Sequence, residues 1–151
     1  MEQFIGTKIV QAEPHTMHRG ARFGTDADGL ITAEPVKEEG YKVRYEDGYE
    51  SWSPKEVFEE AYRRTDGLNF GLALEAARMG KKIARKGWNG KGQYVELGES
   101  FHYISRGTDE QYARHMDIGS AALVFVGTRG RQVGWLASQA DMLADDWYIV
   151  E

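Results

Sequence analysis

The 151-residue sequence contains no cysteine and only three prolines. Without cysteine there can be no disulfide, no cysteine-ligated zinc and no thiol nucleophile. The scarcity of proline argues against a disordered chain. No stretch approaches the roughly 18 apolar residues that a membrane span needs. The N-terminus lacks a basic start followed by an apolar run, so no signal peptide is expected. These absences favour a globular protein that is compatible with a reducing cytosol.

A surplus of positive charge is also lacking. Lys and Arg number 19 against 24 Asp and Glu, and the net charge is −5. A protein that binds nucleic-acid polymers usually carries the opposite balance, so that function is disfavoured. The spacing of Gly87, Gly90 and Gly92 does not fit GxGxxG, and the chain has no P-loop and no G-x-S-x-G elbow. His15 and His18 form H-x-x-H, but no carboxylate completes a recognisable metal spacing, so no metal site is predicted.

The first part of the chain, residues 1–64, is predicted to be a small strand-rich module closed by one helix. YKVRYEDGYESW alternates apolar and polar residues around Asp-Gly, which predicts a hairpin. Residues 4–10 could add a short strand, whereas residues 15–39 show little periodicity and are expected to be mostly loop. A helix should follow, with Ser53 as N-cap, Pro54 in the first helical position and Glu56 completing a capping box.

The second part, residues 65–151, is predicted to be α+β. Asn69 can cap a helix over FGLALEAARM, and Gly80 is a natural stop. KKIAR, QYVELG, FHYISRG and QVGWLA are expected strands, and the apolar run AALVFVGT predicts a buried one. Ser138 and Asp141 form a capping box for one short helix before the closing strand WYIVE. We therefore expect a small antiparallel sheet packed with one longer and one short helix.

One stretch, RKGWNGKGQYV (residues 85–95), combines an aromatic residue, three glycines and three cations. No acid lies between Glu75 and Glu96, which locally reverses the acidic balance of the chain. Backbone amides freed by glycine can approach phosphate oxygens, and Trp88 can stack on a base. Asn89 can bond an adenine edge or simply accept a turn conformation. The residues alone leave two interpretations open, a nucleotide-type site and a structural turn with a core tryptophan.

Two further stretches are candidates for the same site. In GWLASQAD, Trp135 leads into a helix N-terminus where Ser138 and Gln139 could contact a ligand. The alternative there is a capping box and nothing more. In ARHMD, His115 and Asp117 should point to one face of a strand and Arg114 to the other, where an exposed polar face is the simpler explanation.

The order NFGLALEAARMGKKIARKGWNGKG, RHMD and VGWLASQADMLADDWYIVE closely resembles small phage proteins that counter Thoeris immunity. The resemblance covers residues 69–151. It implies a compact α+β protein that assembles as a homotetramer, needs no cofactor and acts in the host bacterial cytoplasm. It also implies capture of glycocyclic ADP-ribose, or of another cyclic nucleotide such as a cyclic dinucleotide, without cleavage. The expected partners are this ligand and further copies of the same chain. The resemblance implies no binding to a membrane or to a nucleic-acid polymer.

The resemblance also suggests ligand-binding residues, and no catalytic ones. Trp88 and Asn89 match the family's WN motif, and Arg114, His115 and Asp117 match a polar strand. The terminal motif is matched by Trp135, Ser138, Gln139 and Asp141. Two other functions stay open: an enzyme that degrades the same messenger, using His115, Asp117 and Asp141, and a virion or host-interaction module with no small ligand. The first 64 residues are additional to the family's minimal domain, and no role is assigned to them.

Overall fold

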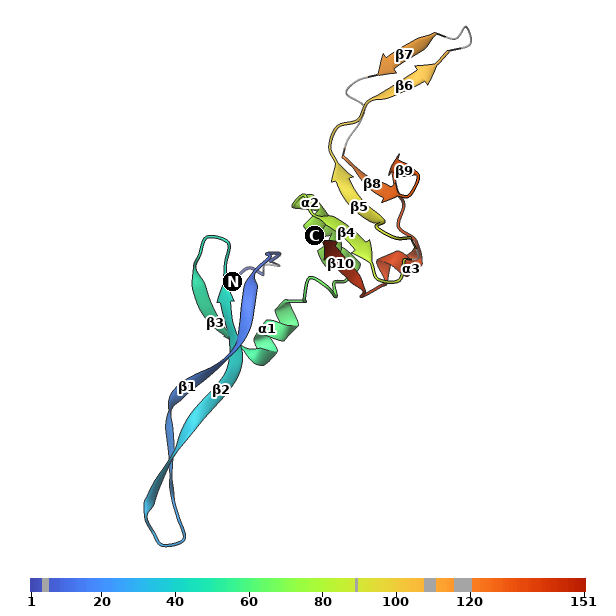
Figure 1. Ribbon diagram of the computed structural model, residues 1–151. Helices are drawn as coiled ribbons and strands as arrows, with labels where there is room; N and C mark the ends of the chain where they lie inside the picture. Colours follow the sequence, from blue (N-terminus) through green and yellow to red (C-terminus); the bar gives the residue numbers. More distant parts are fainter. Residues whose placement is uncertain (4–5, 89, 108–110, 116–120) are drawn as a thin grey trace. The chain divides into compact units, whose positions relative to one another are not determined.

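The computed structural model describes the chain except for residues 4–5, 89, 108–110 and 116–120. The protein forms two compact units, Met1–Arg63 and Arg64–Glu151, and each is described by itself (Figure 1). Within the described residues, no helix is both long and apolar enough to cross a membrane.

The first unit is built on a three-stranded antiparallel sheet with the strand order β1-β2-β3. These strands span Gln11–Thr25, Ile31–Arg44 and Glu50–Pro54. The predicted hairpin around Asp47-Gly48 is confirmed as the β2–β3 connection. Gly48 adopts a φ of 85°, and the Asp47 side chain accepts a hydrogen bond of 3.0 Å from the backbone N–H of Tyr49. Asp-Gly is favoured in tight hairpins because glycine accepts a positive φ and the aspartate side chain accepts a hydrogen bond from the backbone of the turn.

The expectation of a loop over residues 15–39 is wrong. Most of that segment belongs to β1 and β2, which form one long antiparallel hairpin (Figure 1). Periodicity failed to reveal it because almost every side chain of its distal part is exposed on both faces, and a β-bulge between His18 and Ala21 interrupts the alternation. Residues 6–10, expected to join a strand, form none, and β1 begins only at Gln11. The rest of that predicted strand, residues 4–5, lies outside the described residues.

Helix α1 (Lys55–Ala61) closes the first unit, but its start differs from the prediction. Pro54 itself occupies the N-cap position, and no side-chain hydrogen bond caps the helix. The expected capping box of Ser53 and Glu56 is therefore wrong. Packing fixes the helix instead, since the rings of Tyr41 and Phe58 stack with centroids 4.3 Å apart.

The second unit is α+β, as predicted. Five strands form an antiparallel sheet in the order β10-β4-β5-β8-β9, and β6 and β7 form a separate two-stranded sheet. The predicted caps are confirmed: Asn69 accepts a 2.9 Å hydrogen bond from the Leu72 N–H, and Gly80 has a φ of 80°. The helices are α2 (Phe70–Arg78) and α3 (Gln139–Met142), and the strands are β4 (Lys82–Arg85), β5 (Tyr94–Gly98), β6 (Tyr103–Arg106), β7 (Tyr112–His115), β8 (Ala122–Gly127), β9 (Gly130–Val133) and β10 (Trp147–Val150).

The core of the second unit lies between α2 and the sheet. Trp147, Ile83 and Val95 are fully buried there, against the small side chains of Ala73 and Ala77. The alanines let the helix approach the sheet closely, and the indole of Trp147 fills the space that they leave. Strand β8 was expected to be buried, but its described side chains are half-buried except for the buried Val124.

Candidate functional site

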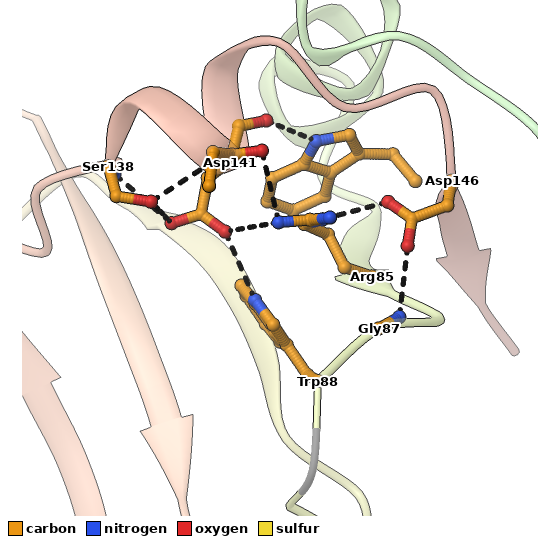
Figure 2. Close-up of polar contacts among 8 residues, drawn as sticks. Arg85, Gly87, Trp88, Ser138, Asp141 and Asp146 are labelled. Carbon is orange, nitrogen blue, oxygen red and sulfur yellow. Dashed lines mark hydrogen bonds and ion pairs between the residues drawn. The ribbon is translucent and has the colours of Figure 1, made fainter.

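Arg85, the last residue of β4, is the centre of an ion-pair network in the second unit (Figure 2). Its Nη1 donates to Asp141 Oδ1 at 2.9 Å, and its Nε donates to Asp146 Oδ1 at 2.8 Å. The Arg85 side chain is only 18% exposed. A guanidinium can serve two carboxylates at once because its donors form a planar fork. Arg85 thereby joins β4 to α3, through Asp141, and to the residue before β10, Asp146.

Asp141 is saturated with hydrogen bonds. Its Oδ2 accepts from the backbone N–H of Ser138 at 3.1 Å and from the Ser138 hydroxyl at 2.7 Å, which confirms the predicted capping box. Its Oδ1 accepts from Arg85 and, at 3.2 Å, from the indole N–H of Trp88. Burial alone would raise the pKa of Asp141, but the hydrogen bonds from Ser138, Arg85 and Trp88 outweigh it and lower the pKa to about 2.

Asp146 fixes the start of the glycine-rich loop. Its Oδ2 accepts a 2.9 Å hydrogen bond from the backbone N–H of Gly87, and the hydrogen bond from Arg85 is the main reason that its pKa is lowered. A Cβ at Gly87 would lie 3.1 Å from that same oxygen, so glycine suits this close approach. The start of the loop is thus anchored at two adjacent residues, at Gly87 by its backbone N–H and at Trp88 by its indole N–H.

Trp88 is half-buried in an aromatic cluster. Its ring lies edge-on to Phe125, Trp135 and Trp147, with centroid separations of 5.6, 6.0 and 5.4 Å. Such edge-to-face contacts are favourable and limit rotation of the ring. The cluster and the Asp141 hydrogen bond together hold the indole in one orientation.

An open cleft of about 430 Å³ lies beside Trp88. The residues that line it come from the segment before α2, from the end of β4, from the loop between β4 and β5, and from β10: Asp66, Arg85, Lys86, Trp88, Gly90, Lys91, Gly92, Gln93 and Tyr148. Among the described residues, three cations and a single carboxylate line this cleft, and that carboxylate, Asp66, pairs with Arg64 at 3.0 Å. The cleft therefore offers positive charge, an aromatic wall and glycine backbone to one ligand.

The structure brings some of the predicted site residues together. Trp88, Trp135, Ser138 and Asp141 meet in the network and its aromatic cluster, and Gln139 opens α3 as an exposed neighbour. The backbone amides of Ser138 and Asp141 are already bonded within the capping box. An anion at this helix N-terminus would therefore not find these two donors.

The predicted polar strand belongs to a different sheet. Arg114 and His115 lie in β7, where Arg114 is exposed and His115 stacks on Tyr103 with a centroid separation of 4.6 Å. The His115 ring also shares a 2.8 Å hydrogen bond with the Ser105 hydroxyl. Within the part of the chain that the structure describes, no hydrogen bond, ion pair or ring contact joins these two side chains to the Trp88 network. Asn89 and Asp117 lie outside the described residues.

The sequence interpretation missed the central role of Arg85 in the ion-pair network and the pairing of Asp146 with it. It also missed Gln93 and Tyr148, which line the cleft. A signal for Arg85 was available. In a strand, residues two apart share a face, so Arg85 shares the face of Ile83, which is fully buried. A charge on a core-facing position needs a partner, and only the fold could show that the partners are Asp141 and Asp146.

We expect acid to destabilise the second unit in a defined pH window. Because the pKa of Asp141 is lowered in the folded state from 3.8 to about 2, its carboxylate stabilises the fold above about pH 4, and this contribution is lost as the pH falls toward 2. The loss should be about 2 kcal/mol. Unfolding by urea, followed by tryptophan fluorescence at pH 6 and at several values below 4, measures it.

Asp141→Asn should show a smaller acid-induced loss of stability, whereas Asp145→Asn, at an exposed neighbour, should match the parent. An Asp141→Asn protein with the full acid response would contradict this assignment.

The unit that carries this network matches a known protein family. Residues 68–150 match the family model described as the Tad2-like, Thoeris anti-defense 2-like domain. This match spans more than half of the chain, and the chain belongs to that family. A relative is the protein named "Thoeris anti-defense 2" from Bacillus phage SP01, which is 36% identical over 87 residues, 55% of this chain and 94% of the relative. The predicted family is thus confirmed, and a phage anti-defence role directed at Thoeris is supported.

Proposed function

We propose that the protein is a phage anti-immune sponge. It binds glycocyclic ADP-ribose-type messengers, with cyclic dinucleotides as a second ligand class, and sequesters them in the host cytoplasm without cleaving them. The observation that carries this proposal is the cationic cleft beside Trp88, in a chain whose net charge is −5. The family membership of residues 68–150 supports the same function.

The cleft suits the chemistry of such a ligand. An adenine would stack on Trp88, since base–aromatic stacking contributes about 1–3 kcal/mol per base. Lys86 and Lys91 would meet the pyrophosphate, whose oxygens accept charge-assisted hydrogen bonds. Arg85 is engaged by two carboxylates, and its part is to position the loop. Asn89 and Gln139 remain candidates for contacts with ribose or with the adenine edge.

Rigidity of the site favours a sponge. A sponge needs slow release of its ligand, and a binding surface that is ordered beforehand loses less entropy on binding. Trp88 is held by Asp141 and by three neighbouring rings, and Gly87 by Asp146. We therefore assign Asp141 and Asp146 a positioning role.

The same carboxylates are poorly suited to acid catalysis. A general acid works best when its pKa lies near the working pH, whereas the pKa of Asp141 is about 2 and that of Asp146 is lowered. This favours binding over the enzyme alternative. His115 and Asp117 are the other acid–base candidates of that alternative.

Self-association is part of the proposal. Around α3, Leu136 is 89% exposed, Leu143 78% and Met142 40%. Exposed large apolar side chains that lie close together are typical of contacts between subunits. We propose that this surface joins copies of the chain, with the homotetramer as the expected assembly.

Native mass spectrometry tests the function directly. The protein is incubated with a panel of cyclic nucleotides that includes glycocyclic ADP-ribose, and subunit number and bound mass are recorded together. We expect a ligand-bound tetramer, and we expect denaturation to release the ligand with its mass unchanged. Release of an altered product would favour the degrading enzyme. Absence of binding across the panel, checked by calorimetry, would favour the host-interaction module.

A further inference from the structure

The distal half of the β1–β2 hairpin is a two-stranded ribbon without a covering layer. Strand β3 pairs only with Gly40–Arg44 of β2, so residues 16–25 and 31–39 pair only with each other (Figure 1). We call these residues the distal ribbon. All of its side chains are exposed except Met17, Val36 and Glu38, which are half-buried. Two strands alone are marginally stable in water, so a ribbon of this length gains from a partner.

Beyond the β-bulge, the distal ribbon is amphipathic. In the observed register, Ala21 lies opposite Pro35, Phe23 opposite Ala33, and Thr25 opposite Ile31. Because alternate residues of a strand point to one side, these six side chains share one face, which we call the apolar face. Phe23 is 73% exposed there and Ile31 80%. The opposite face carries Arg22 across from Glu34, and Gly24 across from Thr32.

The β-bulge creates this segregation. Between His18 and Ala21 the chain of β1 advances three positions while β2 advances two, from Lys37 to Pro35. With an unbroken register, Arg22 would lie opposite Ala33 and place its charge among the apolar side chains. The extra residue moves Arg22 to the other face and Phe23 onto the apolar one. Gly20, with a φ of 75°, makes the irregularity possible at little cost.

The charges at the two ends of the apolar face are complementary. The turn beyond the ribbon carries Asp26 and Asp28, and at the other end His18 lies opposite Lys37. The nearby acids Glu38 and Glu39 are already paired, with Arg19 at 2.7 Å and with Lys55 at 3.6 Å. A two-fold axis could lie between two stacked apolar faces, at the level of the Phe23–Ala33 pair and perpendicular to the strands. It would place the acidic turn of one copy over Lys37 of the other.

We propose that the distal ribbons of two copies of this chain stack through their apolar faces about that two-fold axis. The contact is self-complementary, as a two-fold interface requires. The apolar face has six residues per copy, whereas a standard interface has about 20–30 residues a side, so the contact strengthens an assembly that other surfaces also hold. It does not involve the ligand cleft, and its test uses no ligand.

Cross-linking tests the proposal cleanly, because a single introduced cysteine is the only thiol in the chain. Stacked sheets lie about 10 Å apart, so a short bismaleimide is a better linker than a direct disulfide. Ala33→Cys places the thiol on the apolar face beside the axis. Thr32→Cys is the matched control, one residue away on the opposite face. We expect at least tenfold more covalent dimer from Ala33→Cys than from Thr32→Cys. Equal yields, or no dimer from Ala33→Cys, would overturn the proposal.

A charge exchange tests the two-fold geometry in the Ala33→Cys background. Lys37→Glu should lower the dimer yield about fivefold, because it sets like charges against the turn of the other copy. Adding Asp28→Lys should restore the yield. If the second change fails to restore it, the proposed antiparallel stacking of the ribbons is wrong.

Discussion

Arg85→Ala should lower the free energy of unfolding of the second unit by about 3 kcal/mol, since removing one partner of a largely buried ion pair leaves the other charges uncompensated. Here two carboxylates would lose their shared cation, at Asp141 and at Asp146. Asp141 would keep the hydrogen bonds from Ser138 and Trp88, which limits the loss. Urea unfolding followed by tryptophan fluorescence measures the effect, because three of the four tryptophans belong to this unit.

Arg78→Ala is the matched control for this substitution. Arg78 lies in the same unit and pairs with Glu75 at 2.9 Å, but its side chain is 62% exposed. An exposed helical pair of this spacing contributes about 0.5 kcal/mol or less. Arg85→Ala and Arg78→Ala should therefore differ severalfold in their effect. Similar small losses for both would show that the Arg85 network does not stabilise the fold.

The elements that could be predicted from the sequence are those whose signals are local. Asn69 and Gly80 bracket α2 because a cap and a left-handed stop act within one turn of the helix. Ser138 and Asp141 cap α3 for the same reason. The long β1–β2 hairpin has no such signal. Its side chains meet water on both faces, and one extra residue near Gly20 breaks the only periodicity it has.

The residue types of the candidate site could be predicted from the sequence, but the hydrogen bonds and ion pairs that connect them could not. The aromatic and polar residues of the WN and WLASQAD stretches could be named because they stand in recognisable short patterns. Arg85 bonds to partners 56 and 61 positions away in the chain, and no short pattern encodes such separations. Trp88 illustrates the difference. The sequence left it as either a ligand platform or a core residue, and the structure places the half-buried ring in the aromatic cluster and along the wall of the cleft.

Neutralising the two cleft lysines should weaken ligand binding about 100-fold while leaving stability unchanged. Lys86 and Lys91 are exposed and line the cleft. In the double variant Lys86→Gln/Lys91→Gln, two charge-assisted hydrogen bonds to phosphate would be lost, each contributing about 1.5 kcal/mol. Calorimetry with glycocyclic ADP-ribose measures the dissociation constant, and urea unfolding checks that the fold is intact. The parent protein should also bind more weakly as salt rises, and the double variant should show a shallower dependence.

The control removes the same charge from the same basic stretch. Lys81 and Lys82 are exposed and do not line the cleft, and the Lys82 ammonium lies 5.0 Å from the centre of the Tyr94 ring. If the cleft holds the pyrophosphate, Lys81→Gln/Lys82→Gln should change the dissociation constant less than threefold, because only the long-range field is altered. If both double variants weaken binding equally, net charge rather than the cleft attracts the ligand. If neither does, the ligand binds elsewhere, and the surface around Gln139 becomes the next position to substitute.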